Sequence, residues 1–209
     1  MFDITPYLKP DDPFIGSIPH EQVQAYYDLK YRIARIVQPR SILEIGVRAG
    51  YSAAAFIAAS SPDVKYVGLD FDNSDADIQN RHGGLPGYSQ WAIESLKAHF
   101  PRASIEIVQI DTQVELIQLD GIFDLVHVDG DHSYEGCYRD LVQVERYARW
   151  ILVDDYFHIA DVKSATDCFL SERKHESVSL TGLRGEKVIS LGENDGPKLG
   201  KISQLAKAD

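Results

Sequence analysis

One short segment constrains the fold more than any other part of the chain. Residues 41–45 form an apolar run broken only by Glu44, and Gly46 and Gly50 follow directly. An alanine-rich stretch with high helix propensity then extends from 51 to 59. The pattern predicts a buried strand, a tight glycine turn and a helix. Because a helix N-terminus presents unpaired N–H groups, we expect a small-molecule site here, at the carboxyl end of a first parallel strand.

Strands and helices alternate along the rest of the chain. Further strands are expected at 64–70, 104–110, 123–129 and 150–155, and a terminal antiparallel pair at 177–180 and 187–191. Helices are expected at 20–37, 91–100, 113–119 and 160–173, with a long helix capped by Ser133. This order predicts an α/β fold, a Rossmann-like, doubly wound and mostly parallel sheet with a terminal antiparallel hairpin.

The 209 residues suffice for one domain with a sizeable core. We expect an irregular N-terminal arm at 1–19, a single domain at 20–192, and a polar, frayed tail at 193–209. The helix at 20–37 is expected to cover the sheet edge, with a substrate lid as the alternative, and its tyrosines leave a homodimer possible. The polar segment 71–90 is either a substrate-facing flap or a plain mobile loop.

Composition excludes several classes of partner. Hydrophobic residues make up 44% of the chain and charged residues 25%, which is typical of a globular protein. The formal net charge of -11 argues against a broad nucleic-acid or anionic-membrane surface. We see no signal peptide and no apolar run of ~20 residues. Cys137 and Cys168 have no C-x-x-C spacing and indicate a reducing compartment, so we expect a soluble cytoplasmic protein with a small-molecule substrate.

Acidic residues stand at or near the end of every predicted parallel strand. The carboxyl ends of such strands converge on one crevice, so the acids together predict a shared site. Any single one could instead be a surface residue or a helix cap. The acids are Glu44, Asp70, Asp111, Asp129, Asp154 and Asp155.

The glycine turn argues against a dinucleotide site. A G-x-G-x-x-G motif needs a middle glycine so that pyrophosphate can approach the backbone, and Arg48 stands in that place. The pattern E-x-G-x-x-x-G, followed by Asp70 at the end of the next strand, resembles motif I and the ribose-binding acid of class I S-adenosylmethionine-dependent methyltransferases.

Two further strings extend this resemblance over residues 40–169. FDLVHVDGDHSYEGCYRDL and WILVDDY, together with LEIGVRAGYS, are similar to small bacterial O-methyltransferases that modify macrolides and sugars. The chain departs from the pattern of this family at Arg149 and Trp150, where the family commonly has a glycine pair before the fifth strand.

The resemblance implies a role for each residue of the first motifs. Gly46 and Gly50 would let the backbone meet the methionine part of S-adenosylmethionine. Glu44 would interact with its amino group, Ser52, next to Tyr51, with its carboxylate, and Asp70 with the ribose hydroxyls. Asp111 would face the adenine, and Asp129 would complete the cofactor site.

Asp129, Asp154 and Asp155 are the expected metal ligands. They follow two neighbouring strands, and hard carboxylate oxygens select Mg²⁺, or else Mn²⁺ or Ca²⁺. The metal-dependent branch of the resembled family, which is similar to catechol-type methyltransferases, uses acids at these positions. A cation would also offset the mutual repulsion of the acids. The alternative is that Asp154 or Asp155 caps the following loop and no metal binds.

His132 is the expected general base, because the resembled metal-dependent enzymes place a catalytic histidine at this position. An imidazole that titrates near neutrality can deprotonate a metal-bound hydroxyl, whose oxygen then attacks the sulfonium methyl. The alternative is a histidine that only orients Asp129. His127 and His158 are further candidates, although His127 lies within a strand and is expected to be structural.

Other functions remain open at this point. One is an NAD-dependent oxidoreductase with the same doubly wound fold, and another is a non-catalytic protein that keeps only the cofactor pocket. A third is a relative that uses the same metal-binding acids for another reaction, such as hydroxylation.

Overall fold

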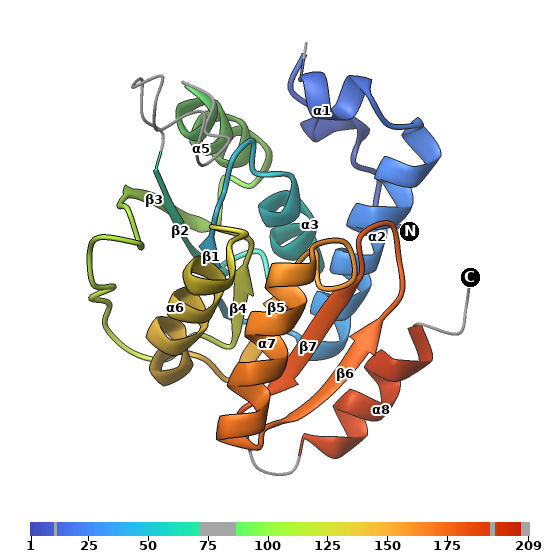
Figure 1. Cartoon of the computed structure of the whole chain (residues 1–209). Coiled ribbons are helices and arrows are strands. Elements are labelled where there is room, and N and C mark those ends of the chain that lie inside the picture. The colour runs from blue at the N-terminus through green and yellow to red at the C-terminus, as the bar shows by residue number, and fades with distance from the viewer. Residues whose placement is uncertain (11, 72–86, 193–194, 206–209) are drawn as a thin grey trace.

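The computed structural model describes residues 1–10, 12–71, 87–192 and 195–205. Within these residues one seven-stranded sheet runs in the order β3-β2-β1-β4-β5-β7-β6 (Figure 1). The parallel strands are β1 (Ser41–Ile45), β2 (Lys65–Asp70), β3 (Ser104–Gln109), β4 (Leu125–Val128) and β5 (Trp150–Val153). β7 (Glu186–Ser190) runs antiparallel to both β5 and β6 (Glu176–Leu180). The predicted doubly wound sheet with a terminal hairpin is confirmed.

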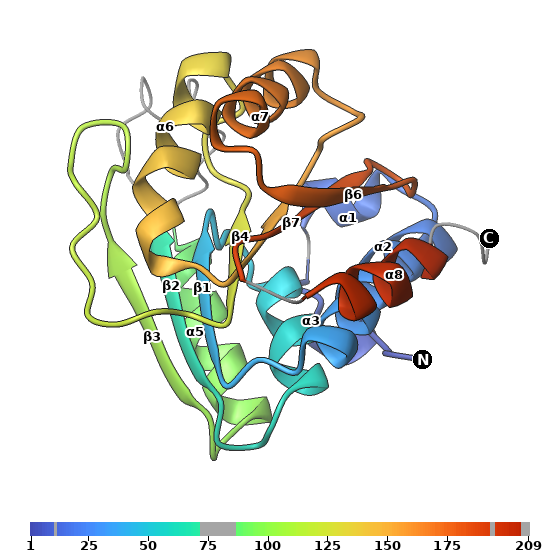
Figure 2. The same cartoon turned by 90° about the horizontal axis from the view of Figure 1, so that it is seen from below.

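Helices cover both faces of the sheet (Figure 2). One face packs against α2 (His20–Val37), α3 (Tyr51–Ala59), α5 (Tyr88–His99) and α8 (Gly196–Leu205), and the other against α6 (Tyr134–Val144) and α7 (Ala160–Arg173). Successive strand residues point to opposite faces, so Ile42 of β1 enters the first core and Leu43 the second. Short turns of helix occur at η1 (Thr5–Tyr7), α1 (Pro13–Gly16) and η2 (Glu145–Tyr147).

Several predicted elements match the structure. The helices expected at 20–37 and 160–173 have those bounds, and Ser133 caps α6 by accepting a hydrogen bond from Gly136 N at 3.1 Å. α2 packs against α3 and α8, and its Tyr26 and Tyr27 are buried within this chain. The homodimer stays a prediction. The flap expected at 71–90 lies largely outside the described residues.

The helix predicted at 113–119 is wrong. This segment is a turn followed by irregular chain in which Val114 and Leu116 are exposed and Ile117 is buried. The Gln143 side chain accepts a hydrogen bond from Ile117 N at 2.8 Å, and Tyr147 donates one to the Ile117 carbonyl at 2.9 Å. Ile117 is therefore fixed by the side chains of Gln143 and Tyr147, and the segment does not need a helix to bury this apolar residue.

The two ends of the chain are more ordered than expected. Phe2 and Ile4 belong to the core on the α2 face, and Phe2 N donates to Asp28 Oδ1 at 2.7 Å, so the arm is not merely irregular. The tail expected to fray contains α8, in which Ile202 and Leu205 are buried. A three-residue spacing places these two side chains on one face of α8 together with the partly buried Leu199. The division at 20 and 192 stays a prediction. Among the described residues, no helix is long and apolar enough to cross a bilayer.

Candidate active site

A cavity of about 680 Å³ opens at the carboxyl ends of the parallel strands. Its walls come from the chain that follows β1, β2, β3 and β4, with α2 and the β6–β7 connection closing one side. This position at the strand ends is the usual ligand site of doubly wound folds, and the volume lies in the range of small-molecule pockets. Seven predicted site residues line it: Gly46, Tyr51, Ser52, Asp70, Asp111, Asp129 and His132.

The glycine turn after β1 is required by the fold itself. Gly46 has a φ of +82°, and a Cβ there would lie 1.9 Å from the carbonyl oxygen of Asp129. Gly50 has a φ of +74° and stands at the N-terminus of α3, against Ala92 of α5. Both glycines therefore allow the end of β4 and α5 to approach the turn, whether or not a ligand is bound.

Asp70, the last residue of β2, is held in place by backbone donors. Its Oδ2 accepts from Arg48 N at 2.8 Å and its Oδ1 from Phe71 N at 2.8 Å, while Ser89 Oγ donates to Oδ2 at 3.3 Å. Asp70 also lines the cavity, and carboxylate oxygens are suitable acceptors for ligand hydroxyls. Asp111 is fixed similarly, because its Oδ1 accepts from Gln113 N at 2.9 Å.

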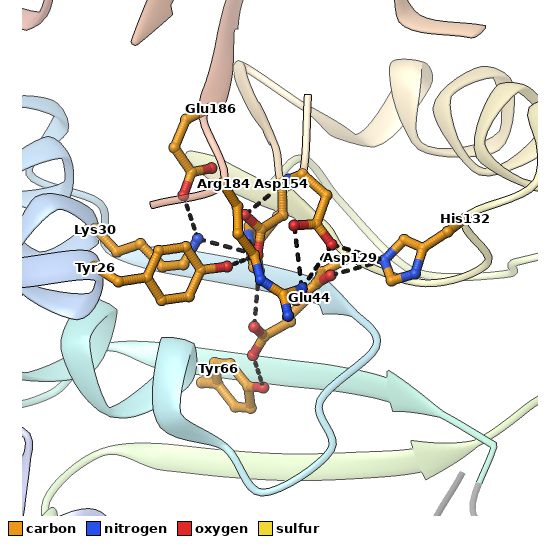
Figure 3. Close-up of polar contacts among 11 residues, drawn as sticks. Tyr26, Lys30, Glu44, Tyr66, Asp129, His132, Asp154, Arg184 and Glu186 are labelled. Carbon is orange, nitrogen blue, oxygen red and sulfur yellow. Dashed lines mark hydrogen bonds and ion pairs between the residues drawn. The ribbon is translucent and has the colours of Figure 1, made fainter. Parts of the chain in front are cut away.

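Glu44 does not line the cavity. It is 1% exposed and points toward the α3 face of the sheet, where its Oε1 lies 2.8 Å from His127 Nδ1 and its Oε2 accepts from Tyr66 Oη (Figure 3). Glu44 and His127 are register partners on β1 and β4, which explains the contact. Glu44 therefore belongs to a buried network, and its predicted contact with a cofactor stays a prediction. The structural reading of His127 agrees with its complete burial, and His158 is exposed away from the cavity.

His132 and Asp129 form a pair on the cavity wall. His132 Nε2 lies 3.2 Å from Asp129 Oδ1 and 3.5 Å from Asp155 Oδ2. The hydrogen bond to Asp129 raises the pKa of His132 to about 9. Burial and the neighbouring Asp154 raise the pKa of Asp129 to about 6. At neutral pH the pair therefore consists mainly of an imidazolium and a carboxylate, and the imidazole must lose its proton before it can act as a base.

Asp154 lies in a second, fully buried cluster behind this pair. Its Oδ2 is 3.2 Å from Lys30 Nζ of α2 and accepts from Tyr26 Oη, and its Oδ1 accepts from Asp155 N at 2.9 Å. Lys30 also donates to Glu186 of β7, and Figure 3 shows Lys30 between the two acids. Burial opposes ionisation of Asp154, but Lys30 holds its pKa well below the ordinary value. Burial and Asp154 raise the pKa of Glu186.

Asp155 is paired with Arg184 of the β6–β7 connection. Arg184 Nη1 lies 3.1 Å from Asp155 Oδ1 and 2.9 Å from Oδ2. Asp155 is fully buried and has a φ of +56°, whereas Arg184 lines the cavity. The guanidinium therefore lies between Asp155 and the space in which a ligand would bind.

The three acids expected to share one metal ion are divided by the fold. Among the described residues, ligand atoms within 4.8 Å of one another form two sets, His127 with Asp129 and Asp154, and Asp129 with His132 and Asp155. Asp154 and Asp155 do not reach the cavity wall. Each already has a cationic partner, so the donor set as predicted does not fit one ion that also contacts a ligand.

Sequence reasoning missed three residues of this region. Lys30 could have been found, because it follows Tyr26 and Tyr27 at helical spacing and precedes Ile33, which makes it a single cation on an apolar face. Such a lysine requires a buried acid. Neither Glu186 nor Arg184 carries such a signal, because both come to the site only through the pairing of β7 with β5.

Comparisons with known proteins point to one family. The family described as "Methyltransferase domain" matches residues 43–156, more than half of the chain. No curated protein matches the chain significantly.

Solved structures share the fold at low sequence identity. PaMTH1 of Podospora anserina, a methyltransferase bound to SAH, superposes with a TM-score of 0.67 and 17% identity over 88% of this chain and 83% of its own. An O-methyltransferase of Bacillus cereus in complex with SAH has a TM-score of 0.60 and 14% identity over 90% and 94%. The O-methyltransferase TomG of Streptomyces achromogenes, in complex with SAM, has a TM-score of 0.57 and 19% identity over 80% and 79%.

Proposed function

The chain belongs to the methyltransferase domain family, and from this premise we propose that it transfers a methyl group from S-adenosylmethionine to a hydroxyl of a small molecule. One observation carries the proposal. A single cavity has the glycine turn and Asp70 on its wall together with the Asp129–His132 pair. A donor subsite would thus lie beside a histidine that, in its neutral form, would accept the hydroxyl proton. The fold neighbours whose names specify O-methylation or bound SAM support the same chemistry.

The donor would lie along the β1–α3 turn. Asp70, oriented by Arg48 N and Phe71 N, would accept hydrogen bonds from the ribose hydroxyls. Ser52, in the first turn of α3, would bind the carboxylate, because the N–H groups of a helix N-terminus attract anions. Asp111 would lie nearest the adenine.

The acceptor would approach from the side of His132. In its neutral form the imidazole takes the hydroxyl proton, and the oxygen attacks the methyl carbon while the C–S bond breaks. The bonding electrons pass to sulfur and give S-adenosylhomocysteine. Asp129 holds the imidazole in position, and the cavity supplies proximity of the two reactants.

A divalent cation is a second candidate for the group that would assist deprotonation of the acceptor beside Asp129 and His132. The ligand atoms of Asp129, His132 and Asp155 lie within 4.8 Å of one another, which favours it. When bound, such an ion would lower the pKa of an acceptor hydroxyl. Lys30 and Arg184, the existing partners of Asp154 and Asp155, oppose it.

Calorimetric titration tests the donor site. S-adenosylhomocysteine is expected to bind the wild type, and Asp70→Ala should weaken binding by about tenfold or more, since a carboxylate hydrogen bond contributes about 1.5–3 kcal/mol. NADH serves as the control ligand, because Arg48 occupies the place that a dinucleotide leaves to glycine. Binding of NADH instead of S-adenosylhomocysteine would overturn the proposal.

Turnover separates an enzyme from a protein that only binds the cofactor. Formation of S-adenosylhomocysteine should be measured against a panel of sugars, catechols and other phenols. His132→Ala should lower turnover by about 10²–10⁴-fold, the usual contribution of a general base, and leave cofactor affinity unchanged. Equal turnover in the variant would exclude His132 as the base.

A further inference from the structure

We propose that Lys30 and Arg184 provide the positive charge that the strand-end acids would otherwise need from a divalent metal ion, so that these acids bind no metal. The inference rests on the proposed function only in placing the acceptor beside Arg184. It concerns two cations contributed by α2 and by the β6–β7 connection, far from Asp154 and Asp155 in sequence.

Both carboxylate oxygens of Asp154 are already engaged by donors of the folded chain, and the residue is buried. Its Oδ2 receives Lys30 and Tyr26, its Oδ1 receives Asp155 N, and the residue is 2% exposed. Lys30 cannot turn away to admit a metal, because its ammonium is fully buried and bridges to Glu186. A buried ammonium without its acids would be strongly unfavourable, so the folded chain retains this cluster.

Arg184 likewise occupies the oxygens of Asp155 that a metal ion would need, and it does so from the side of the cavity. One guanidinium nitrogen contacts both Asp155 oxygens, at 2.9 and 3.1 Å. An ion bound by Asp129, His132 and Asp155 would lie next to this guanidinium, and the like charges would repel each other. Asp129 then remains the one acid of the three on the cavity wall, and His132 is its partner.

The arrangement assigns Arg184 a role toward the acceptor. Its side chain is 25% exposed and lines the cavity on the same side as His132 and Asp129 (Figure 3). A guanidinium is charged at every working pH and donates hydrogen bonds in a fixed geometry. It would stabilise the acceptor oxygen as that oxygen loses its proton, which makes Arg184 a positioning and electrostatic group in place of an ion.

Titration with Mn²⁺ tests the proposal without knowledge of the acceptor. Metal-stripped wild type, Arg184→Met and the double variant Arg184→Met/Asp155→Asn are titrated and followed by electron paramagnetic resonance. We expect no saturable site in the wild type at millimolar Mn²⁺. Arg184→Met should bind Mn²⁺ at least about tenfold more tightly, because removal of a neighbouring positive charge leaves Asp155 uncompensated. The added Asp155→Asn should abolish that gain. Arg173→Met, in an ion pair with Glu145 away from the cavity, is the matched control.

Two results would overturn the proposal. One is a saturable Mn²⁺ site in the wild type that disappears in Asp129→Asn or Asp155→Asn. The other is Arg184→Met that binds Mn²⁺ no better than the wild type. Titration of the same samples with S-adenosylhomocysteine keeps this question apart from the proposed function. Loss of that binding would reject the methyl-donor site, whereas the Mn²⁺ result alone decides whether the acids bind a metal and whether Arg184 takes its place.

Discussion

Lys30 Nζ, midway along α2, lies 3.2 Å from Asp154 Oδ2 at the end of β5, and both side chains are almost completely buried. A cation from a helix thus neutralises a buried acid at the carboxyl end of an interior strand. The contact joins the helix that carries Tyr26 and Tyr27 to the strands that carry the acids. The floor of the candidate site is therefore fixed by electrostatics as well as by apolar packing.

The first prediction concerns this ion pair. Lys30→Met should lower the free energy of unfolding by about 3–5 kcal/mol, because it leaves Asp154 buried without its cation. Lys30→Met/Asp154→Asn should recover part of the loss, since the unpaired charge is removed. Urea denaturation measures both. Lys163→Met, in an exposed pair with Asp167, should hardly change the midpoint. A double variant as unstable as the single one would show that packing, not charge, dominates.

The second prediction concerns the pKa of His132. Nuclear magnetic resonance of ¹⁵N-labelled imidazoles should place it near 9 in the wild type, because Asp129 stabilises the charged ring. Asp129→Asn should shift it toward the ordinary value of about 6.5. The exposed Asp63→Asn variant is the control. If His132 acts as the base, methyl transfer should increase as the pH rises toward 9, since only the neutral imidazole accepts a proton. Titration near 6.5 in both proteins would contradict the hydrogen-bonded pair.

The third prediction concerns Asp140 of α6, whose pKa is raised to about 7 by burial. Its Oδ1 accepts from Gln113 Nε2 at 3.1 Å, and its Oδ2 has no hydrogen-bond partner among the described residues. Between pH 4 and 7 the folded chain keeps a proton that the unfolded chain releases, so this group makes stability fall as the pH rises. The loss is roughly 4 kcal/mol by linkage.

Asp140→Asn isolates that contribution. An amide does not titrate, so the stability of the wild type relative to the variant should decrease from pH 4 to pH 7. Thermal unfolding over this range at constant ionic strength measures the difference. A difference that stays constant across the window would show that Asp140 is ionised throughout.

The sequence predicted the sheet and the region of the site because both depend on local patterns. Strand, turn and helix signals around Gly46 sufficed to place the cavity, and Asp70 and Asp129 do line it. What those patterns could not supply is the face to which each acid points. Glu44 lies within β1, not after it, so the alternation of side chains turns it into the core against His127.

The cationic partners of Asp154 and Asp155 could not be predicted from local sequence patterns either. Lys30 precedes Asp154 by 124 positions and Arg184 follows Asp155 by 29, and only the packing of α2 and the pairing of β7 bring them together. Clustered acids did indicate a need for compensating charge. The sequence alone could not distinguish a bound ion from side chains supplied by distant elements.

The fourth prediction concerns the turn after β1. Gly46→Ala combines a strained φ of +82° with a Cβ placed 1.9 Å from the Asp129 carbonyl, a backbone atom that cannot move without displacing the end of β4. Gly87→Ala provides the matched control, because Gly87 has a φ of +79° and, apart from its chain neighbours, no atom of the described residues lies within 4 Å of its added Cβ. Gly87→Ala should lower the free energy of unfolding by about 1–2 kcal/mol, the penalty of the left-handed conformation alone.

Gly46→Ala should destabilise the chain by at least about 1–3 kcal/mol more, as overpacking does, and should weaken S-adenosylhomocysteine binding because Asp129 and His132 move with the strand. Urea denaturation and calorimetry on the two variants measure these effects, and equal stability of the two would mean that β4 adjusts freely to the added methyl group.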